Sequence, residues 1–407
     1  MQELLFLAHR IPFPPNKGDK IRSYHMLAHL ARRYRVHVGA FIDDPEDWRH
    51  VADVQKLCGE TCFIALNPLI AKSRSLVALL RREPLTVQYY RNRAFGSWVK
   101  RVLAERPIAG IFVFSSAMAQ YVDDPRLAVP RVLDFVDMDS DKWRQYAERH
   151  RWPQNWVYRR EARTLFDAER RWAGIFDKSL FVSQAEADLF CQQAPATRAR
   201  VVAVENGVDT DYFSPQRKYP NPYAASADVL VFVGAMDYWA NADAVQWFAD
   251  EVFPRVYARQ PRSRFYIVGA RPSKQVLRLD DLPGVCVTGG VADVRPYVAH
   301  AKAVVAPLRI ARGVQNKVLE AMAMARPVIA TTLAMDGLRG WDALRPLVTD
   351  DPARMAEIAS RFLQGEDGST YGASGRACVL QRYSWDANLA GLTDVMHAAV
   401  TRTAAVA

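Results

Sequence analysis

The sequence has no long hydrophobic run and only five cysteines. No apolar run in its 407 residues approaches the ~20 that a membrane-spanning helix needs. The opening stretch MQELLFLAHRIPFPP begins with an acidic residue and reaches His9 and Arg10 too early for a signal peptide. The cysteines are odd in number and scattered, and no histidine cluster joins Cys58 and Cys62 to make a zinc site. We therefore expect a cytosolic chain with reduced thiols and no metal.

Acidic residues are scarce in one part of the chain. The net charge is +10, and residues 1–200 hold 32 Lys and Arg against 23 Asp and Glu, whereas residues 201–407 hold 22 against 21. Nine basic residues but only two acidic ones lie in residues 66–106. No helix-turn-helix, zinc finger or aromatic RNA-binding sheet organises these charges, so we do not expect nucleic acid as a partner.

Within that basic stretch, residues 69–83 (LIAKSRSLVALLRRE) have the pattern of one amphipathic helix. Six apolar residues fall on one side of it and most of the basic residues on the other. Such a helix could lie on an anionic membrane surface. The alternative is an ordinary surface helix that packs its apolar face on the core, and the pattern leaves both open.

Short apolar runs of strand length alternate with helix-length segments in two series. The first series is ELLFLAH, RVHVGAF, TCFIAL, GIFVFSS, RVLDFVD, KSLFVS and RVVAVEN, and the second is VLVFVGA, RFYIVGA, VCVTGG, AVVAPL, RPVIATT and LRPLVTD. This alternation predicts an α/β protein with two Rossmann-like, doubly wound parallel sheets. A stretch rich in Pro, Asn and Tyr follows the first series. We predict domains at residues 1–205 and 206–385, and a helix over 386–407 that crosses back to the first domain.

One βαβ unit of the second series has charged residues in an apolar helix. The strand AVVAPL leads through a basic loop, RIARG, into a helix predicted over residues 314–325 and then into another strand. A helix that begins at the carboxyl edge of a parallel sheet directs free N–H groups at an anion. The loop and helix start are therefore candidate phosphate binders, namely Gly313, Val314, Gln315 and Asn316. Lys317 and Glu320 lie one turn apart, and on spacing alone a weak surface ion pair would explain them.

Five stretches together resemble the group 1 (family 4) glycosyltransferases of the GT-B fold. They are RIPFPPNKGDKIRSYHMLAHLA, LFVSQAEADLF, VENGVDTDYF, VFVGAMDYWANADAVQWF and GVQNKVLEAMAMARPVIATT. The resemblance is closest to bacterial sugar transferases of exopolysaccharide loci. It implies two domains that face a central cleft and a retaining, metal-independent transfer from a nucleoside diphosphate sugar, with no other cofactor. The implied acceptor is a glycan hydroxyl, on a lipid-linked oligosaccharide at the inner face of the plasma membrane.

The resemblance also implies roles for residues of the second domain. Glu320 occupies the position whose carboxylate accepts hydrogen bonds from the ribose hydroxyls of the donor. Gly234 follows the first strand of this domain, where the family usually adds an Arg and a Lys that this sequence lacks. The family also usually has a glutamate where this chain has Arg312. We therefore expect Arg312 and Lys317 to supply the positive charge that the diphosphate needs.

In the first domain, PPNKGDKIRS holds Gly18 and Lys20 where the family has a glycine-rich loop near the donor phosphate and the acceptor. A plain surface loop is the alternative. In LDFVDMDSDKW, Asp137 matches the place of a histidine beside the reacting sugar, so it is the candidate acceptor-side base or sugar-positioning group. The aspartates of this stretch lack the Gly and distal Glu of an EF-hand, and no metal ligands are predicted.

Three other functions remain open on the sequence. A GT-B epimerase acting on the nucleotide sugar would need no acceptor, and a non-catalytic nucleotide-sugar binder would fit the missing glutamate at position 312. A dinucleotide-dependent oxidoreductase is less compatible, because no G-x-G-x-x-G follows ELLFLAH or VLVFVGA.

Overall fold

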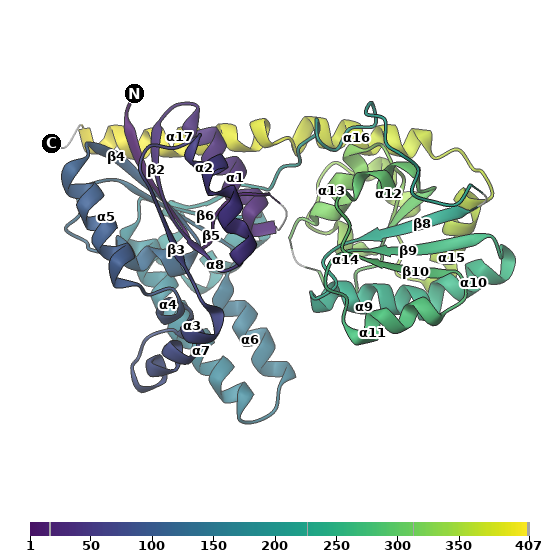
Figure 1. Ribbon diagram of the computed structural model, residues 1–407, viewed down its shortest axis with the longest axis horizontal. Coiled ribbons are helices and arrows are strands. Elements are labelled where there is room, and N and C mark those ends of the chain that lie inside the picture. Colours follow the sequence, from purple (N-terminus) through teal and green to yellow (C-terminus); the bar gives the residue numbers. More distant parts are fainter. Residues whose placement is uncertain (16–17, 226, 312, 405–407) are drawn as a thin grey trace. The chain divides into compact units, whose positions relative to one another are not determined.

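The chain forms two compact units. The computed structural model of the protein describes residues 1–15, 18–225, 227–311 and 313–404. One unit consists of Met1–Glu205 with Asn388–Ala407, and the other of Asn206–Ala387. Each unit has its own hydrophobic core and its own parallel sheet flanked by helices (Figure 1). The predicted α/β class with two Rossmann-like sheets is confirmed.

The sheet of the first unit has seven parallel strands in the order β3-β2-β1-β4-β5-β6-β7. Its strands are β1 Glu3–Ala8, β2 Arg35–Ile42, β3 Thr61–Ala65, β4 Ile108–Phe114, β5 Arg131–Val136, β6 Lys178–Phe181 and β7 Val201–Ala203. The central strands are continuous apolar runs because helices cover both faces of a parallel sheet. The strand order reverses beside β1, so the carboxyl edge at this point is the expected ligand position.

The helices of the first unit connect these strands. They are α1 Gly18–Ala31, η1 Pro45–His50, α2 Val51–Gln55, α3 Pro68–Ser75, η2 Leu76–Leu80, α4 Leu85–Tyr89, α5 Arg93–Glu105, η3 Ser116–Tyr121, α6 Asp139–Arg149, α7 Gln154–Ile175, α8 Gln184–Gln193 and η4 Pro195–Arg200. α6 and α7 form a long hairpin, drawn in blue-green in Figure 1.

The amphipathic helix predicted over residues 69–83 is not a single helix. α3 ends at Ser75, a 3-10 helix (η2) follows, and the chain is extended at Arg81. Five of the six apolar side chains are exposed instead of packed on the core, and Leu69 and Leu80 are 80% and 90% exposed. The alternative of an ordinary packed surface helix is therefore wrong.

The sheet of the second unit has five parallel strands in the order β10-β9-β8-β11-β12. Its strands are β8 Asp228–Val233, β9 Ser263–Val268, β10 Val285–Gly289, β11 Ala303–Ala306 and β12 Val328–Ala330. The strand predicted at LRPLVTD is wrong, because a 3-10 helix (η7, Asp342–Leu347) occupies most of it. Only Val348 pairs with β12, as an isolated bridge to Ala330. Pro346 has no N–H to donate to a sheet, which favours the helical turn.

Helices cover the second unit on both sides of its sheet. They are α9 Trp239–Trp247, η5 Phe248–Val252, α10 Phe253–Arg259, α11 Lys274–Leu277, η6 Arg278–Asp281, α12 Arg295–His300, α13 Asn316–Ala323, α14 Thr332–Met335, α15 Pro352–Leu363 and α16 Ser369–Arg382. The helix predicted over residues 314–325 is α13, which is shorter at both ends. Its carboxyl end leads to Ala325, whose φ of 52° cannot continue a right-handed helix.

The last helix, α17 (Trp385–Ala404), packs on the first unit from Asn388 onward. Leu389, Leu392 and Met396 are at most 2% exposed, and His29 on α1 is hydrogen-bonded to Thr393 (2.7 Å). Over the residues that the structure describes, no helix has both the length and the hydropathy to cross a bilayer.

Candidate functional site

The main candidate site is the carboxyl edge of the sheet in the second unit. β8, β9, β11 and β12 run parallel, so the loops after them leave the sheet at one edge. The loop after β8 begins with Gly234 and the loop after β9 begins with Gly269. A Cβ on Gly269 would lie 1.7 Å from the carbonyl oxygen of Gly234, so the two loops pack backbone against backbone. Glycine at both positions is what allows the two loops to approach this closely.

The loop between β11 and α13 packs in the same way. Gly313 has a φ of 64°, a left-handed conformation that glycine adopts without strain. A Cβ on Gly337 would lie 2.4 Å from the carbonyl oxygen of Gly313. Gly313 also accepts a hydrogen bond from the Gln315 side chain (3.1 Å), while Val314 is half-buried against the core. These contacts fix where α13 begins.

The start of α13 has polar groups without partners. No side chain caps this helix. The side-chain oxygen of Asn316, the first residue of α13, is buried, and it has no hydrogen-bond partner among the described residues. An uncapped helix start presents free N–H groups and partial positive charge. The residues predicted to bind phosphate therefore lie together at this helix start, although their role stays a prediction.

Glu320 and Lys317 do not form the surface ion pair that their spacing suggested. Both are half-buried on α13. The Lys317 ammonium lies 5.5 Å from the centre of the Phe232 ring, and Glu320 has no hydrogen bond or ion pair within the part of the chain that the structure describes. Burial raises the pKa of Glu320 to about 7 and lowers that of Lys317 to about 8, and the charge of each partly offsets the shift of the other. A buried carboxylate without a partner is costly unless a ligand supplies one.

Tyr212 lies within electrostatic reach of Glu320. Burial raises the pKa of this phenol, and Glu320 is among the charges that add to the rise. The guanidinium of Arg295 stacks 3.6 Å from the centre of the Tyr212 ring and is itself held by Asp293 (2.7 Å).

Two further cations lie at this edge, and neither was singled out from the sequence, although Arg309 begins the loop RIARG that was predicted to bind phosphate. Arg271 follows β9 and pairs with Asp237 (2.8 Å), and Arg309 follows β11 and pairs with Asp243 (2.5 Å). Their position within three residues of a strand end was the signal that could have identified them. Arg312, which was predicted together with Lys317 to hold the diphosphate, lies outside the described residues.

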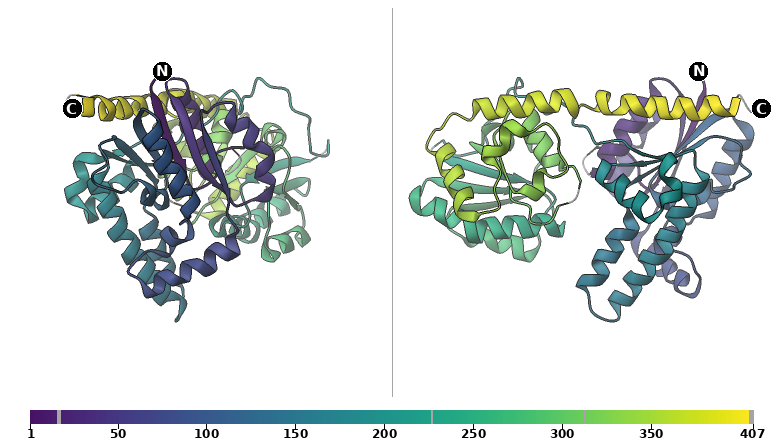
Figure 2. Two further views of the ribbon diagram at one scale, coloured as in Figure 1. Left: turned by 60° about the vertical axis from the view of Figure 1, so that its left-hand side comes forward. Right: turned by 180° about the vertical axis from the view of Figure 1, so that it is seen from behind.

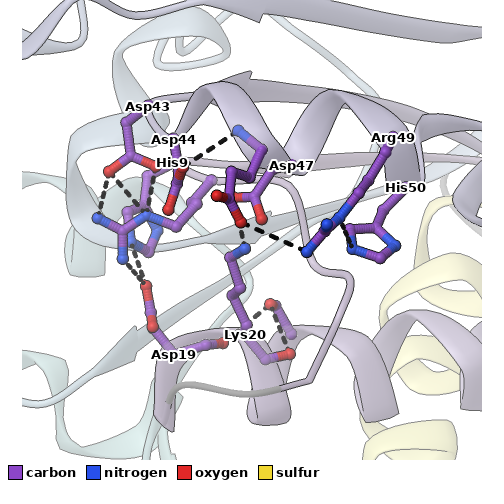
Figure 3. A network of polar contacts seen from close by, with 11 residues as sticks. His9, Asp19, Lys20, Asp43, Asp44, Asp47, Arg49 and His50 are labelled. Atoms are coloured by element: carbon purple, nitrogen blue, oxygen red, sulfur yellow. Dashed lines mark hydrogen bonds and ion pairs between the residues drawn. The ribbon is translucent and has the colours of Figure 1, made fainter. Parts of the chain in front are cut away.

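The carboxyl edge of the first unit carries a second set of charged residues (Figure 3). Lys20, on α1, is 1% exposed and forms an ion pair with Asp47 (2.6 Å). Its charge is thus neutralised within the fold, and its predicted role at the donor phosphate stays a prediction. Gly18 is the first residue of α1, and a Cβ there would have open space around it, so nothing in the fold itself demands glycine.

His9 immediately follows β1 and was missed as a candidate. Its Nε2 lies 3.3 Å from a carboxylate oxygen of Asp19, and its ring stacks on Phe114 with 5.8 Å between ring centres. The other ring nitrogen, Nδ1, is buried, with no partner in the described part of the chain. Arg10 bridges Asp19 (2.6 Å) and Asp43 (2.6 Å), which holds the carboxylate that faces His9 (Figure 3). A histidine–carboxylate pair at this edge is suited to proton transfer.

Asp137, the predicted acceptor-side group, follows β5. It is 29% exposed and pairs with Lys142 (2.7 Å). The preceding residue, Val136, has a φ of 67°, and Ser115 after β4 has a φ of 79°. Left-handed conformations in residues other than glycine are strained and cluster at functional sites. The strain falls on neighbouring strand ends at the edge where Asp137 lies, but the role of Asp137 remains a prediction.

One buried ion pair joins α1 to β5 in the first unit. Arg22 on α1 donates to Asp134 on β5 (2.8 and 3.2 Å) and to the carbonyl of Val204 (2.7 Å). Both charged side chains are fully buried. Burial raises the pKa of Asp134, and Arg22 opposes the rise. Among the described residues, no three His, Cys, Asp or Glu side chains are grouped as metal ligands.

A family model described as glycosyl transferases group 1 matches residues 227–365. These residues include the whole carboxyl edge of the second sheet. No curated protein matches the chain.

Solved glycosyltransferase structures share the fold over the whole chain. Sucrose-phosphate synthase from Thermosynechococcus elongatus is 16% identical with a TM-score of 0.67, and the match covers 98% of each chain. Anabaena HepE in complex with UDP-glucose is 16% identical with a TM-score of 0.64, covering 98% of this chain and 100% of HepE. WaaG, a glycosyltransferase involved in lipopolysaccharide biosynthesis, is 15% identical with a TM-score of 0.65, covering 96% and 99%. The chain thus has the GT-B fold, and its residues 227–365 match the model of the group 1 glycosyl transferases.

Proposed function

We propose that this protein is a glycosyltransferase that moves a sugar from a nucleoside diphosphate sugar to a hydroxyl of a glycan acceptor. The observation that carries the proposal is Glu320, a half-buried carboxylate without a partner among the described residues, one turn inside an uncapped helix of a group 1 domain. Two ribose hydroxyls can donate to one carboxylate at once, which would supply the missing partner. The solved complex of HepE with UDP-glucose supports a nucleotide sugar as the ligand.

The diphosphate of the donor would bind at the start of α13. The uncapped start of α13 and the ammonium of Lys317 offer positive charge there. Arg312 adds a further cation in the sequence of this loop. If Arg312→Ala and Lys317→Ala both left donor affinity unchanged, this assignment of the phosphate grip would be wrong.

In the reaction, the bond between the anomeric carbon and the diphosphate oxygen breaks, and a bond from the anomeric carbon to the acceptor oxygen forms. Positive charge at the helix start stabilises the negative charge that grows on the leaving diphosphate. The acceptor oxygen attacks from the face that the diphosphate leaves, so the configuration is retained, and no metal is needed. Asp137 would accept the proton of the acceptor hydroxyl or position the sugar.

We assign the acceptor to a lipid-linked oligosaccharide in exopolysaccharide or cell-surface polysaccharide synthesis, with the protein in the cytosol at the inner face of the plasma membrane. The basic excess of residues 66–106 supports an acceptor at an anionic surface. The structural likeness to WaaG, which acts in lipopolysaccharide biosynthesis, is compatible with such an acceptor.

The test is thermal stabilisation of the purified protein by nucleoside diphosphates and their sugars. A ligand that binds only the folded state at a hundred times its Kd adds about 2.7 kcal/mol to the free energy of unfolding. We expect one base to raise the melting temperature and Glu320→Ala to remove the shift. The matched control is Glu357→Ala, which changes an exposed glutamate on α15 in the same unit. No shift with any nucleotide would overturn the proposal.

Product analysis then separates the three activities that the site could support. The protein is incubated with the stabilising sugar nucleotide, with and without a membrane extract as acceptor source. A transferase releases nucleoside diphosphate only when acceptor is present, whereas an epimerase converts the sugar nucleotide without acceptor. A non-catalytic binder leaves the sugar nucleotide unchanged in both samples.

A further inference from the structure

A cluster of large hydrophobic side chains is exposed on the first unit. We call it the apolar tip, and its members are Leu69, Ile70, Leu76, Val77, Leu80, Trp152 and Trp156. Leu80 is 90% exposed, and Leu69 and Trp152 are each 80% exposed. The tip consists of two short segments, residues 69–80 and 152–156. They hold seven of the sixteen large hydrophobic residues that are exposed in the described part of the chain. A concentration of this kind marks an interaction surface, unlike apolar residues scattered singly.

The two segments of the tip are fastened to each other. The Arg160 guanidinium on α7 donates to the carbonyls of Ala78 and Arg81 and, at 3.2 Å, to that of Glu83. The next residue, Glu161, is buried and accepts hydrogen bonds from the first two N–H groups of α4, at 2.6 and 2.9 Å. The segment that carries the exposed leucines is therefore held on α7 by hydrogen bonds to its backbone.

Trp156 lies on the same face of α7 as Arg160, because residues four apart in a helix are neighbours. It is therefore on the side that faces η2. Both views of the first unit show residues 68–80, in dark blue, beside the free end of the α6–α7 hairpin (Figures 1 and 2). The segments that carry the exposed leucines and tryptophans thus lie at one end of this unit.

Basic side chains without acidic partners surround the tip. The exposed basic residues in and next to its two segments are Lys72, Arg81, Arg82, Arg151, Arg159 and Arg163. None of them forms an ion pair with a residue that the structure describes. The nearby acids are already neutralised, since Glu83 pairs with Arg91 and Glu148 with Arg144. The surroundings of the tip are therefore strongly cationic.

We propose that the apolar tip inserts into the interfacial layer of an anionic lipid bilayer. Leucine side chains would enter the acyl boundary, the two tryptophans would lie at the headgroup level, and the free cations would meet lipid phosphates. Charge complementarity selects this occupant over a second copy of the chain, because two such cationic ends would repel each other. The inference rests on the membrane location in the proposed function and deepens it. Because the surface lies outside the candidate donor site, vesicle binding tests it without donor or acceptor, and its failure would leave the proposed sugar transfer standing.

The experiment measures binding of the full chain to sedimented vesicles of phosphatidylcholine with or without phosphatidylglycerol. We expect binding only to the anionic vesicles, weakened by salt. Leu69→Ser with Leu80→Ser should lower the partition coefficient at least tenfold. Arg81→Gln with Arg82→Gln should lower it to a similar extent, because each cation near an anionic surface is worth roughly fivefold.

The matched controls change similar residues on the second unit. Leu277→Ser with Leu380→Ser alters two leucines that are 49% and 48% exposed, and Arg217→Gln with Lys218→Gln alters an adjacent basic pair. Both should bind vesicles as the unaltered protein does. Melting temperatures of all variants show whether the fold is intact.

Tryptophan quenching locates the tip itself. Lipids brominated on their acyl chains should quench the fluorescence of the unaltered protein, and Trp152→Phe with Trp156→Phe should remove this quenching. The proposal is overturned if the protein does not bind anionic vesicles, or if the tip variants bind as well as their controls. It is also overturned if the unaltered protein forms a dimer that the leucine variant does not form.

Discussion

Glu320 and Lys317 lie one turn apart on α13, yet the pKa of Glu320 is raised and that of Lys317 is lowered. Both shifts favour the neutral form of the side chain. The cause is burial, which their mutual attraction only partly offsets. Surface pairs of the same spacing behave differently: Arg354 and Glu357 on α15 form an ion pair at 2.7 Å, and the pKa of Glu357 is lowered. Two glutamates with the same sequence separation from a basic residue thus have pKa values shifted in opposite directions. Under the proposed function, the half-buried pair is the one that a bound donor would stabilise.

Donor affinity should depend on pH through Glu320. Its pKa is raised from 4.5 to about 7 in the unliganded protein, so below pH 7 a proton must leave before the carboxylate can accept both ribose hydroxyls. The affinity for a nucleoside diphosphate sugar should therefore fall as pH falls from 7.5 to 5.5, approaching tenfold per unit. Calorimetric titration at several pH values measures this. The same shift means that the folded state holds this proton more tightly than the unfolded state does. It therefore stabilises the fold at low pH, and this stabilisation is lost as the pH rises from about 4.5 to 7.

The control for that titration is Glu320→Gln, which has the same shape but no proton to lose in this range. Its affinity should be weaker and independent of pH between 5.5 and 7.5. A pH dependence that persists in the glutamine variant would show that another group controls binding.

The buried pair of Arg22 and Asp134 should be among the most sensitive positions in the first unit. Asp134→Asn removes the negative charge and leaves the Arg22 charge buried, although the Val204 carbonyl still accepts a hydrogen bond from it at 2.7 Å. We expect a loss of about 3–5 kcal/mol in the free energy of unfolding. Denaturant unfolding followed by circular dichroism measures it.

A surface pair provides the comparison. Arg345 and Asp342 are 71% and 77% exposed, and Asp342→Asn should cost no more than about 1 kcal/mol. Equal losses in the two variants would mean that burial of the first pair adds nothing to its importance.

At the scale of elements, glycines decide how the loops of the second unit meet. The loops after β8 and β9 touch through Gly234 and Gly269, and the loop before α13 touches Gly337 through its main chain. A single added methyl group would force two backbone segments apart. The position of the candidate donor site therefore depends on residues that contribute no side chain.

Gly269→Ala should both destabilise the second unit and remove the thermal shift given by the donor. Its Cβ would lie 1.7 Å from the Gly234 carbonyl, so the loops must separate, at a cost of at least about 1–3 kcal/mol. Gly290→Ala is the matched control, because its Cβ would lie 3.5 Å from Ala270, an ordinary contact. A normal donor-induced shift in the Gly269 variant would show that the contact does not position the site.

Capping at the ends of elements follows the sequence in part. The pattern SQAE predicts a capping box, and Ser183 does accept a hydrogen bond from the Glu186 N–H (3.2 Å). The Glu186 carboxylate, however, accepts from the N–H of Met138 (2.9 Å), 48 residues away. The local sequence pattern determines where α8 begins, while tertiary packing brings the Glu186 carboxylate into a hydrogen bond with the backbone of a distant segment.

At the scale of the whole molecule, the chain returns to its first unit after completing the second. α17 contributes Leu389, Leu392 and Met396 to the core contacts of the first unit, and Thr393 to a hydrogen bond with His29. Each large apolar side chain that is fully buried adds about 1.5–3 kcal/mol to the free energy of unfolding. The stability of the first unit therefore depends on a segment that is distant in sequence.

A chain that stops at Ala387 should therefore unfold in two steps. The first unit loses three buried apolar side chains and should melt earlier, whereas the second unit, which retains residues 206–387, should keep its stability and its response to the donor. Differential scanning calorimetry with and without the stabilising nucleotide separates the transitions. If both units lost stability equally, α17 would be serving the second unit as well.

The sequence by itself determined the two series of parallel strands, the break near residue 205 and the helix that carries Glu320, because apolar periodicity, glycine and proline act locally. It also predicted a cationic surface on the first unit from composition alone. It missed the 3-10 helix in place of the strand at residues 344–350, because a short apolar run fits either structure.

Only the tertiary structure decided which charged groups are free. Lys20 is paired with Asp47, 27 residues away, whereas Glu320 has no partner among the described residues. The exposure of Leu69 and Leu80 and the placing of His9 beside Asp19 were likewise settled by packing. Burial and pairing depend on contacts between segments far apart in the chain, and no local pattern contains that information.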